Sequence, residues 1–241
     1  MFENLKKQDD VKEEGDVIFG SVLETNVYNF TVDSAYADES DGGAAFLRVS
    51  LISDEGRTLT QTVYFTSGDA KGNSITYDVK DKKRKPTGEK RYLPGYVIAS
   101  DIHEHITGIP LAEMVTENKL IKTWDNEAKK EVPQEKAVLT DLLGKSIKLG
   151  IQEQLVIKQV NKDGKWVNSD DTRKQNEIVK VFNAETNQTT DEKAANTEAQ
   201  FMDKWIKSYA GKVIDKTGGK VKAEASAKPT GSDTPKKKMF G

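Results

Sequence analysis

The sequence predicts a mainly β protein whose strands form an irregular antiparallel barrel, with short helices between the later strands and one C-terminal helix. Three observations lead to this fold class. Segments rich in β-branched and aromatic residues alternate apolar and polar positions with period two. Turn residues separate neighbouring segments in the manner of hairpins. The strands also cluster early in the chain, which favours hairpins over a βαβ sheet.

The early strands form the first predicted hairpin. Val27 to Ala37 is a strand, and Ala44 to Ile52 is the next one. The turn Ser53 to Gly56 leads into a partner strand, Arg57 to Thr66, because Gly56 can take a positive φ. Leu59, Val63 and Phe65 alternate along that strand, so we expect them on one buried face.

The segment Gly68 to Gly95 looks like an insertion between core elements. Its short arms, Ser74–Val79 and Lys90–Leu93, are expected to pair as a second hairpin. The strongly basic stretch Lys80–Arg91 would then form its tip.

The second half of the chain mixes helices and strands. Tyr96–Ile106 has helical spacing and ends at Gly108. Lys145–Val160 is the longest strand candidate, because apolar residues recur at odd positions: Ile147, Leu149, Ile151, Leu155 and Ile157. Thr190 or Asp191 can cap the C-terminal helix, whose apolar stripe is expected to pack on the β core. The remaining expected elements are a short helix at Pro110–Val115, a strand at Leu120–Trp124, a polar turn at 125–130, a helical turn at Val138–Leu143, a turn at 161–165, a strand at Glu177–Phe182 and the C-terminal helix at Thr190–Ala210.

Charge and composition divide the chain into three parts. Residues 17–210 are expected to form one domain, preceded by a flexible acidic segment, 1–16, and followed by a disordered basic tail, 211–241. The chain has no cysteine, no apolar signal segment and no run of the roughly 18 apolar residues that a membrane span needs. We therefore expect a cytoplasmic protein without disulfides or thiol chemistry.

Catalytic and nucleotide-binding motifs are mostly absent. Gly144-Lys145-Ser146 matches the end of a phosphate-binding loop, but the required upstream glycine is missing and a strand follows it. His103 and His105, two residues apart on a helix, are expected to be surface or partly packed residues rather than metal ligands. No cofactor is expected. Metal-dependent nuclease chemistry among the 39 acids stays open as a third function.

The basic segment is the best positive signal for function. Its cations can neutralise phosphates, and the neighbouring tyrosines Tyr64, Tyr77 and Tyr92 can stack on bases, as binding of single-stranded DNA requires. Alternatively, the segment is a solvated hairpin tip whose tyrosines only anchor it. Trp124 is another possible stacking residue. The cations are Lys80, Lys82, Lys83, Arg84, Lys85, Lys90 and Arg91.

The C-terminus carries a second signal, the sequence P-K-K-K-M-F-G. Lys236, Lys237 and Lys238, followed by Phe240, have the form of a short docking peptide at the end of a flexible linker. The same residues could add non-specific affinity for DNA or serve no binding function.

This layout, with its acidic start, hairpin-rich barrel, basic aromatic insert, long strand and detached tail, resembles bacteriophage single-stranded DNA-binding proteins. The resemblance implies an OB-like antiparallel barrel that coats exposed strands in phage DNA replication and recombination, in the cytoplasm of an infected bacterium. The tail resembles that of the podovirus type, which also activates transcription by host RNA polymerase. Lys236–Lys238 would then contact the polymerase or replication proteins.

One feature departs from that family. Most of its members end in acidic residues and an aromatic, whereas this chain ends in bases followed by Met239 and Phe240. The difference argues against recruiting replication enzymes through an acidic tip and favours the transcription type. A non-DNA-binding phage interaction or structural module is the main alternative function.

Overall fold

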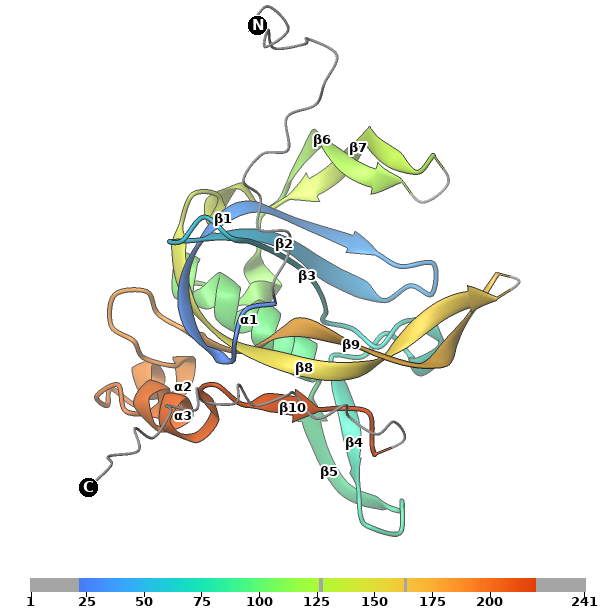
Figure 1. Cartoon of the computed structure of the whole chain (residues 1–241). Helices are drawn as coiled ribbons and strands as arrows, with labels where there is room; N and C mark the ends of the chain where they lie inside the picture. Colours follow the sequence, from blue (N-terminus) through green and yellow to red (C-terminus); the bar gives the residue numbers. More distant parts are fainter. Residues whose placement is uncertain (1–21, 126–127, 163, 220–241) are drawn as a thin grey trace, which may run out of the picture.

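The computed structural model describes residues 22–125, 128–162 and 164–219. Within them, an eight-stranded sheet curves around helix α1 (Pro94–Thr107), and a separate two-stranded hairpin extends from the molecule (Figure 1). The predicted class, mainly β with an antiparallel sheet and few helices, is confirmed. Among the described strands, only the short β10 (Val213–Asp215) joins its neighbour in parallel.

The first three strands form a meander. Strand β1 (Asn26–Glu39) pairs with β2 (Ala45–Ser53), which pairs with β3 (Thr58–Tyr64), both antiparallel. The predicted hairpin is confirmed, with Gly56 at φ 76° in its turn. Val63 is buried, and Leu59 and Phe65 pack against the core as the alternation predicted.

The longest hairpin joins β8 (Ser146–Lys162) to β9 (Lys165–Phe182). Strand β8 also pairs with the first half of β1. Strand β9 begins twelve residues earlier than expected, because backbone pairing with β8 extends it through a polar segment without apolar alternation. Together, β9-β8-β1-β2-β3 form the curved wall of the molecule.

The two ends of this wall meet at a side chain. The Oε1 atom of Gln61 on β3 accepts a hydrogen bond from the backbone N–H of Ile178 on β9, at 2.9 Å. Within the described part of the chain, no strand pairing joins β3 to β9. The curvature is therefore shown, whereas closure into an OB-like barrel remains an expectation.

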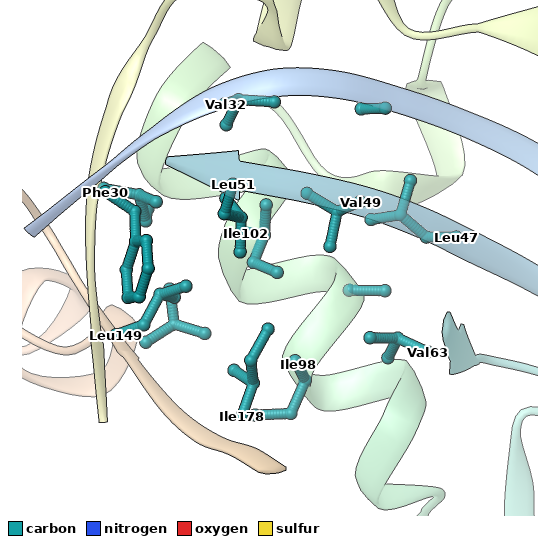
Figure 2. Packing of buried hydrophobic residues seen from close by; sticks show 14 of the residues in the cluster. Phe30, Val32, Leu47, Val49, Leu51, Val63, Ile98, Ile102, Leu149 and Ile178 are labelled. Atoms are coloured by element: carbon teal, nitrogen blue, oxygen red, sulfur yellow. The ribbon is translucent and has the colours of Figure 1, made fainter. Parts of the chain in front are cut away.

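The hydrophobic core lies between the curved sheet and α1 (Pro94–Thr107) (Figure 2). Pro94 starts the helix and Gly108 ends it at φ 79°, which confirms the predicted element. The helix buries one face at positions spaced three or four residues apart. The sheet and helix side chains labelled in Figure 2 are Phe30, Val32, Leu47, Val49, Leu51, Val63, Leu149, Ile178, Ile98 and Ile102.

A further hairpin consists of β6 (Glu117–Asp125) and β7 (Lys130–Val138). It extends from the end of the molecule opposite to the separate two-stranded hairpin (Figure 1). Strand β7 was not predicted, because it is charged and contains Pro133, which sheets tolerate only at edges and bulges. It reaches β1 through its last two residues only. The expected helical elements beside this hairpin are short 3₁₀ turns, at Leu111–Glu113 and Thr140–Leu142; a third lies at Asp69–Lys71.

The prediction of one helix over Thr190–Ala210 was wrong. There are two helices, α2 (Thr190–Ala194) and α3 (Phe201–Tyr209), separated by a bend in which Asn196 has φ 50°. The cap is Thr189, which forms a reciprocal capping box with Glu192. Trp205 of α3 is buried against the sheet, as expected. Its ring lies over Gly150 on β8, 3.4 Å from the position that a Cβ at Gly150 would take.

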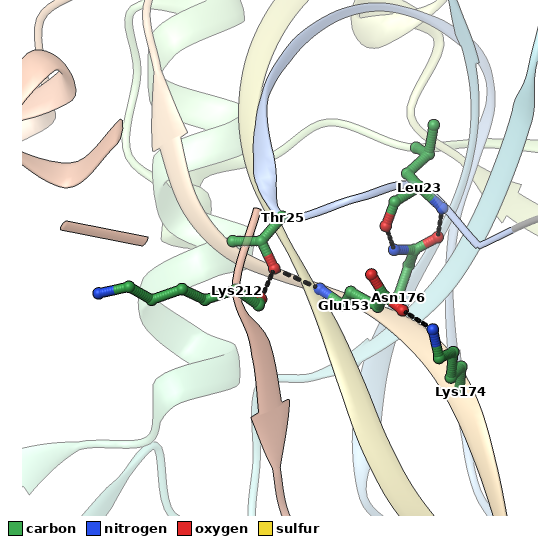
Figure 3. A network of polar contacts seen from close by, with 6 residues as sticks. All are labelled: Leu23, Thr25, Glu153, Lys174, Asn176 and Lys212. Atoms are coloured by element: carbon green, nitrogen blue, oxygen red, sulfur yellow. Dashed lines mark hydrogen bonds and ion pairs between the residues drawn. The ribbon is translucent and has the colours of Figure 1, made fainter. Parts of the chain in front are cut away.

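A buried polar network fixes both ends of the described chain to the sheet (Figure 3). Thr25 donates to the carbonyl of Lys212 at 2.5 Å and accepts from the N–H of Glu153 at 2.9 Å. Asn176 forms two hydrogen bonds with the backbone of Leu23, at 2.7 and 2.8 Å. The ion pair of Lys174 with Glu153, at 2.7 Å, completes it.

The network places β10 (Val213–Asp215) beside β8, beyond the boundary expected at residue 210. The sheet therefore extends into the segment predicted to be a disordered tail. The acidic segment 1–16 and the terminal residues Lys236, Lys237, Lys238 and Phe240 lie outside the described residues.

Candidate nucleic-acid interface

The basic hairpin consists of β4 (Thr76–Lys80) and β5 (Pro86–Tyr92), which confirms the predicted insertion. The second arm begins at Pro86, four residues before the expected start at Lys90, so the turn covers only residues 81–85. The Oδ1 atom of Asp81 accepts hydrogen bonds from the N–H groups of Lys83 and Lys85, both at 2.8 Å. Arg84 has φ 61°. This turn holds the cations in a defined order along an exposed tip.

The hairpin is anchored at its base. The N–H of Leu93 donates to the carbonyl of Ile75 at 2.8 Å. The ring of Tyr92 stacks on Tyr96 of α1, with centroids 5.0 Å apart. The hairpin therefore continues directly into α1 and projects away from the curved sheet (Figure 1).

Three adjoining hollows lie along this base. The hairpin hollow, of about 1060 Å³, is lined by Tyr64, Tyr77, Lys80 and Lys90 among others. It shares Tyr64, Pro94 and Gly95 with the next hollow. The two therefore meet at the start of α1.

The strand hollow, of about 580 Å³, lies where β3, α1 and β9 meet. Tyr64 and Tyr92 line it, together with Asp101 and Glu177. It shares Tyr92, Asp101 and Lys180 with the helix hollow, of about 790 Å³, which extends towards α2 and α3. We call the three hollows together the tyrosine groove.

The tyrosine rings in the groove are accessible. Tyr64, Tyr77 and Tyr92 are 49%, 43% and 56% exposed. Tyr64 meets Phe46 edge-on at 5.4 Å, and Tyr92 has Tyr96 on one face. A neighbouring ring thus holds Tyr64 and Tyr92, and all three tyrosines keep part of their surface open for stacking.

The structure brings together some of the predicted site residues. Tyr64, Tyr77, Lys80 and Lys90 share the hairpin hollow, and Tyr92 lines the other two hollows. The remaining cations line none of the three. Arg91 is paired with Glu89 at 2.7 Å, while Lys82, Lys83, Arg84 and Lys85 lie exposed at the hairpin tip.

The charges along the groove change from one end to the other. At the hairpin hollow, Lys71, Lys80 and Lys90 face only one acid, Asp78. The helix hollow has the opposite balance, with two lysines against four acids: Lys180, Lys204, Asp101, Asp191, Glu192 and Glu198. A phosphate backbone is therefore favoured at the hairpin end.

Sequence reasoning missed the polar residues of the strand hollow. Burial raises the pKa of Asp101 to about 6, against a hydrogen bond that Thr190 donates to its Oδ1 at 2.8 Å. Burial also raises the pKa of Glu177. Neither carboxyl forms an ion pair with another described residue. Their sites depend on the contact of α1 with β9, which no local pattern encodes.

Gly95 was also missed, although the Pro94-Gly95 pair was recognised as a break. It lies in the first turn of α1, where a Cβ would collide with the backbone carbonyl of Tyr64. Its lack of a side chain lets α1 approach β3, and this approach sets the two hollows beside each other.

The histidines are not part of the groove. Both were expected at the surface or partly packed, but His103 and His105 are buried. His103 shares a hydrogen bond with the carbonyl of Ile109 at 2.9 Å, and neither ring nitrogen of His105 has a partner. Among residues 22–125, 128–162 and 164–219, no three His, Asp or Glu side chains are grouped to hold a metal.

Comparisons of the sequence with models of known protein families and with curated proteins find no match. In the described part of the chain, no helix has both the length and the apolar character of a membrane span.

Proposed function

We propose that this protein binds single-stranded DNA in the tyrosine groove and along the basic hairpin. The observation that carries the proposal is the set of exposed rings in adjoining hollows. Tyr77 and Tyr64 line one hollow, Tyr64 and Tyr92 the next. Unpaired bases can stack on such rings whatever their sequence, whereas paired bases in a duplex cannot reach them.

Charge supports the same assignment. The hairpin Thr76–Tyr92 has seven basic and three acidic residues in a chain with a net charge of −2. Its lysines at the hairpin hollow lie beside the tyrosines, so one strand can place its phosphates on the cations and its bases on the rings. The tip cations extend this positive surface outward.

The mode of action follows from this arrangement. A strand held by stacking and by phosphate contacts is kept from pairing and shielded from other proteins. As the resemblance implies, the proposed role is coating exposed strands during phage DNA replication and recombination. Contact of the tail with RNA polymerase is a separate prediction, because residues 236–240 lie outside the described part.

A fluorescence titration with a labelled oligonucleotide, as single strand and as duplex, tests the proposal. We expect clear preference for the single strand. Tyr64→Leu and Tyr92→Leu should each weaken binding by roughly tenfold, because a stacked base contributes about 1–3 kcal/mol. Tyr64→Phe and Tyr92→Phe keep the rings and should bind nearly as the wild type.

Trp124→Leu is the matched control. Trp124 is 58% exposed on β6, in the hairpin at the other end of the molecule from β4 and β5. We expect its replacement to leave the titration unchanged. Equal affinity for single strand and duplex, or a loss with Trp124→Leu but with neither tyrosine variant, would refute the proposed site.

A further inference from the structure

The strand hollow combines two aromatic rings with two carboxyl groups. Tyr64 and Tyr92 line it beside the apolar side chains of Val63 and Ile98, and Asp101 and Glu177 supply the acids. A ligand that fits must therefore have a flat apolar face and hydrogen-bond donors at its edge. Exposed rings at a basic hairpin suffice for DNA in general, so the carboxyls call for a separate explanation.

The Asp101 carboxyl is held in place with one oxygen unused. Oδ1 accepts from Thr190 at 2.8 Å, and no described residue donates to Oδ2. Oδ2 is also not among the described polar atoms that are buried without a partner, so it retains access to the hollow. This oxygen is an oriented acceptor.

Glu177 lies next to the contact that joins β3 to β9. The Oε1 atom of Gln61 accepts from the N–H of Ile178, and the Gln61 side chain partly offsets the burial that raises the pKa of Glu177. Gln61 therefore ties β3 to β9 beside the second carboxyl. The hollow presents two carboxyls, from α1 and β9, and one lysine, Lys180.

We propose that the strand hollow selects a base with an exocyclic amino group over thymine. The inference rests on the proposed binding of single-stranded DNA. Cytosine and adenine present one amino group, and guanine presents an amino group beside a ring N–H. A carboxylate oxygen can accept hydrogen bonds from these N–H groups.

Thymine meets the same surface unfavourably. Its single ring N–H lies between two carbonyl oxygens, and those oxygens would face Asp101 and Glu177. Two acceptors brought together without a donor repel each other, so the carboxyls disfavour thymine as well as attract the other bases. Lys180 is the one lysine among the described residues that line the strand hollow, where it stands against two acids, whereas three lysines face one acid at the hairpin hollow. The phosphates are therefore favoured at the hairpin end and the carboxyls outnumber the donor at the base.

A competition titration with three short oligonucleotides tests the preference. One is all thymidine, the second has every third base replaced by cytosine, and the third has the same positions replaced by uracil. Uracil keeps both carbonyls and lacks the amino group, so it controls for loss of the thymine methyl. We expect the wild type to favour the cytosine oligonucleotide by roughly tenfold and to bind the other two alike.

Asp101→Asn and Glu177→Gln identify the groups responsible. Each replaces an acceptor with an amide that can also donate, so each should reduce the preference for cytosine and increase affinity for thymidine. Glu198→Gln is the matched control, because Glu198 lines the helix hollow and not the strand hollow. It should change all affinities alike and leave the preference intact. The two test residues lie on different elements, so a folding defect in one variant leaves the other informative.

The outcomes separate the inference from the function that it rests on. Tight and equal binding of all three oligonucleotides by the wild type would overturn the base preference and leave DNA binding standing. A cytosine preference that survives both amide substitutions would also overturn it, because the selecting groups would lie elsewhere. Failure of every oligonucleotide to bind would refute the proposed function itself.

Discussion

Two titratable side chains one turn apart on α1 respond to burial in opposite directions. Burial raises the pKa of Asp101 to about 6 and lowers the pKa of His105 to about 4. In both cases the uncharged form is favoured, because the charged form loses its hydration. Asp101 faces the groove, whereas the ring nitrogens of His105 have no hydrogen-bond partner.

His105→Leu should change how stability depends on pH. Between pH 6.5 and 4 the unfolded chain protonates His105 and the folded chain does not, so the free energy of unfolding falls as pH is lowered. This effect amounts to roughly 3 kcal/mol below pH 4. The His105→Leu variant lacks this pH effect. At pH 7 the variant should be as stable as the wild type or about 1 kcal/mol more stable, because it has no buried ring nitrogen without a partner.

Urea unfolding of both proteins at pH 7, 5.5 and 4.5 checks this expectation. Asp101 acts in the opposite sense: its raised pKa makes stability fall as pH rises from about 4 to 6. That contribution is common to both proteins and cancels in the difference between them. A constant difference across the three pH values would show that His105 is protonated equally in both states.

Individual residues were predictable where their role is local. Gly56 and Gly108 were identified because a turn and a helix end need a positive φ, and both have one. The burial of His103 and His105 could not be predicted, because it depends on packing between α1 and segments distant in sequence. The same holds for the carboxyl of Asp101.

At the scale of elements, the contact between α1 and β3 determines the groove. Gly95→Ala should move the start of α1 away from β3, because the new Cβ would collide with the carbonyl of Tyr64. We expect a loss of roughly 1–3 kcal/mol in the free energy of unfolding and weaker binding of single-stranded DNA. Urea unfolding and the fluorescence titration measure the two effects.

Gly42→Ala provides the comparison for that variant. Nothing lies within 4 Å of a Cβ at Gly42, so its stability and binding should match those of the wild type. If both alanine variants behave alike, the close approach at Gly95 does not determine the shape of the groove.

The attachment of β10 gives a second prediction at this scale. Thr25→Val keeps the shape of a side chain that is 1% exposed but removes both hydrogen bonds of its hydroxyl. The carbonyl of Lys212 and the N–H of Glu153 lose a partner, which should cost about 1–3 kcal/mol. Thr60→Val, at an exposed hydroxyl on β3, should stay within about 0.5 kcal/mol of wild type in the same urea titration.

The elements that the sequence predicted well are those with one buried face. Strands β1, β2, β3 and the first half of β8 alternate apolar and polar residues, and α1 has a helical stripe with clear ends. Strand β7 and the first half of β9 have no such pattern, because pairing with a neighbour rather than burial forms them. The C-terminal helix was predicted as one because its bend at Asn196 interrupts no apolar period.

On the scale of the whole molecule, opposite ends carry two similar hairpins with different surroundings. The β4–β5 hairpin adjoins the tyrosine groove, and the β6–β7 hairpin extends from the other end (Figure 1). The sequence predicted the first as a binding element from its charge and flanking tyrosines. It could not show that only Lys80 and Lys90 of its cations reach the hollows, because that depends on how the hairpin joins α1.

The two hairpins allow a test of whether charge acts by position or only by amount. Lys82, Lys83 and Lys85 are changed to Gln and Arg84 to Gly, because φ at Arg84 is 61°. The control makes the same changes in β6–β7: Lys119, Lys122 and Lys130 to Gln, and Lys129, at φ 51°, to Gly. Both variants have the same net charge and one new glycine in a turn.

If the tip cations contact phosphates, only the β4–β5 variant should bind with a weaker salt dependence than the wild type. The slope of the logarithm of the binding constant against the logarithm of salt concentration should fall in magnitude by about 0.7 for each contact removed from a single strand. The loss for four contacts is then about 3, measured by fluorescence titration across a series of salt concentrations. Equal slopes for the two variants would mean that the tip is solvated and that the phosphates rest on Lys80 and Lys90 at the groove alone.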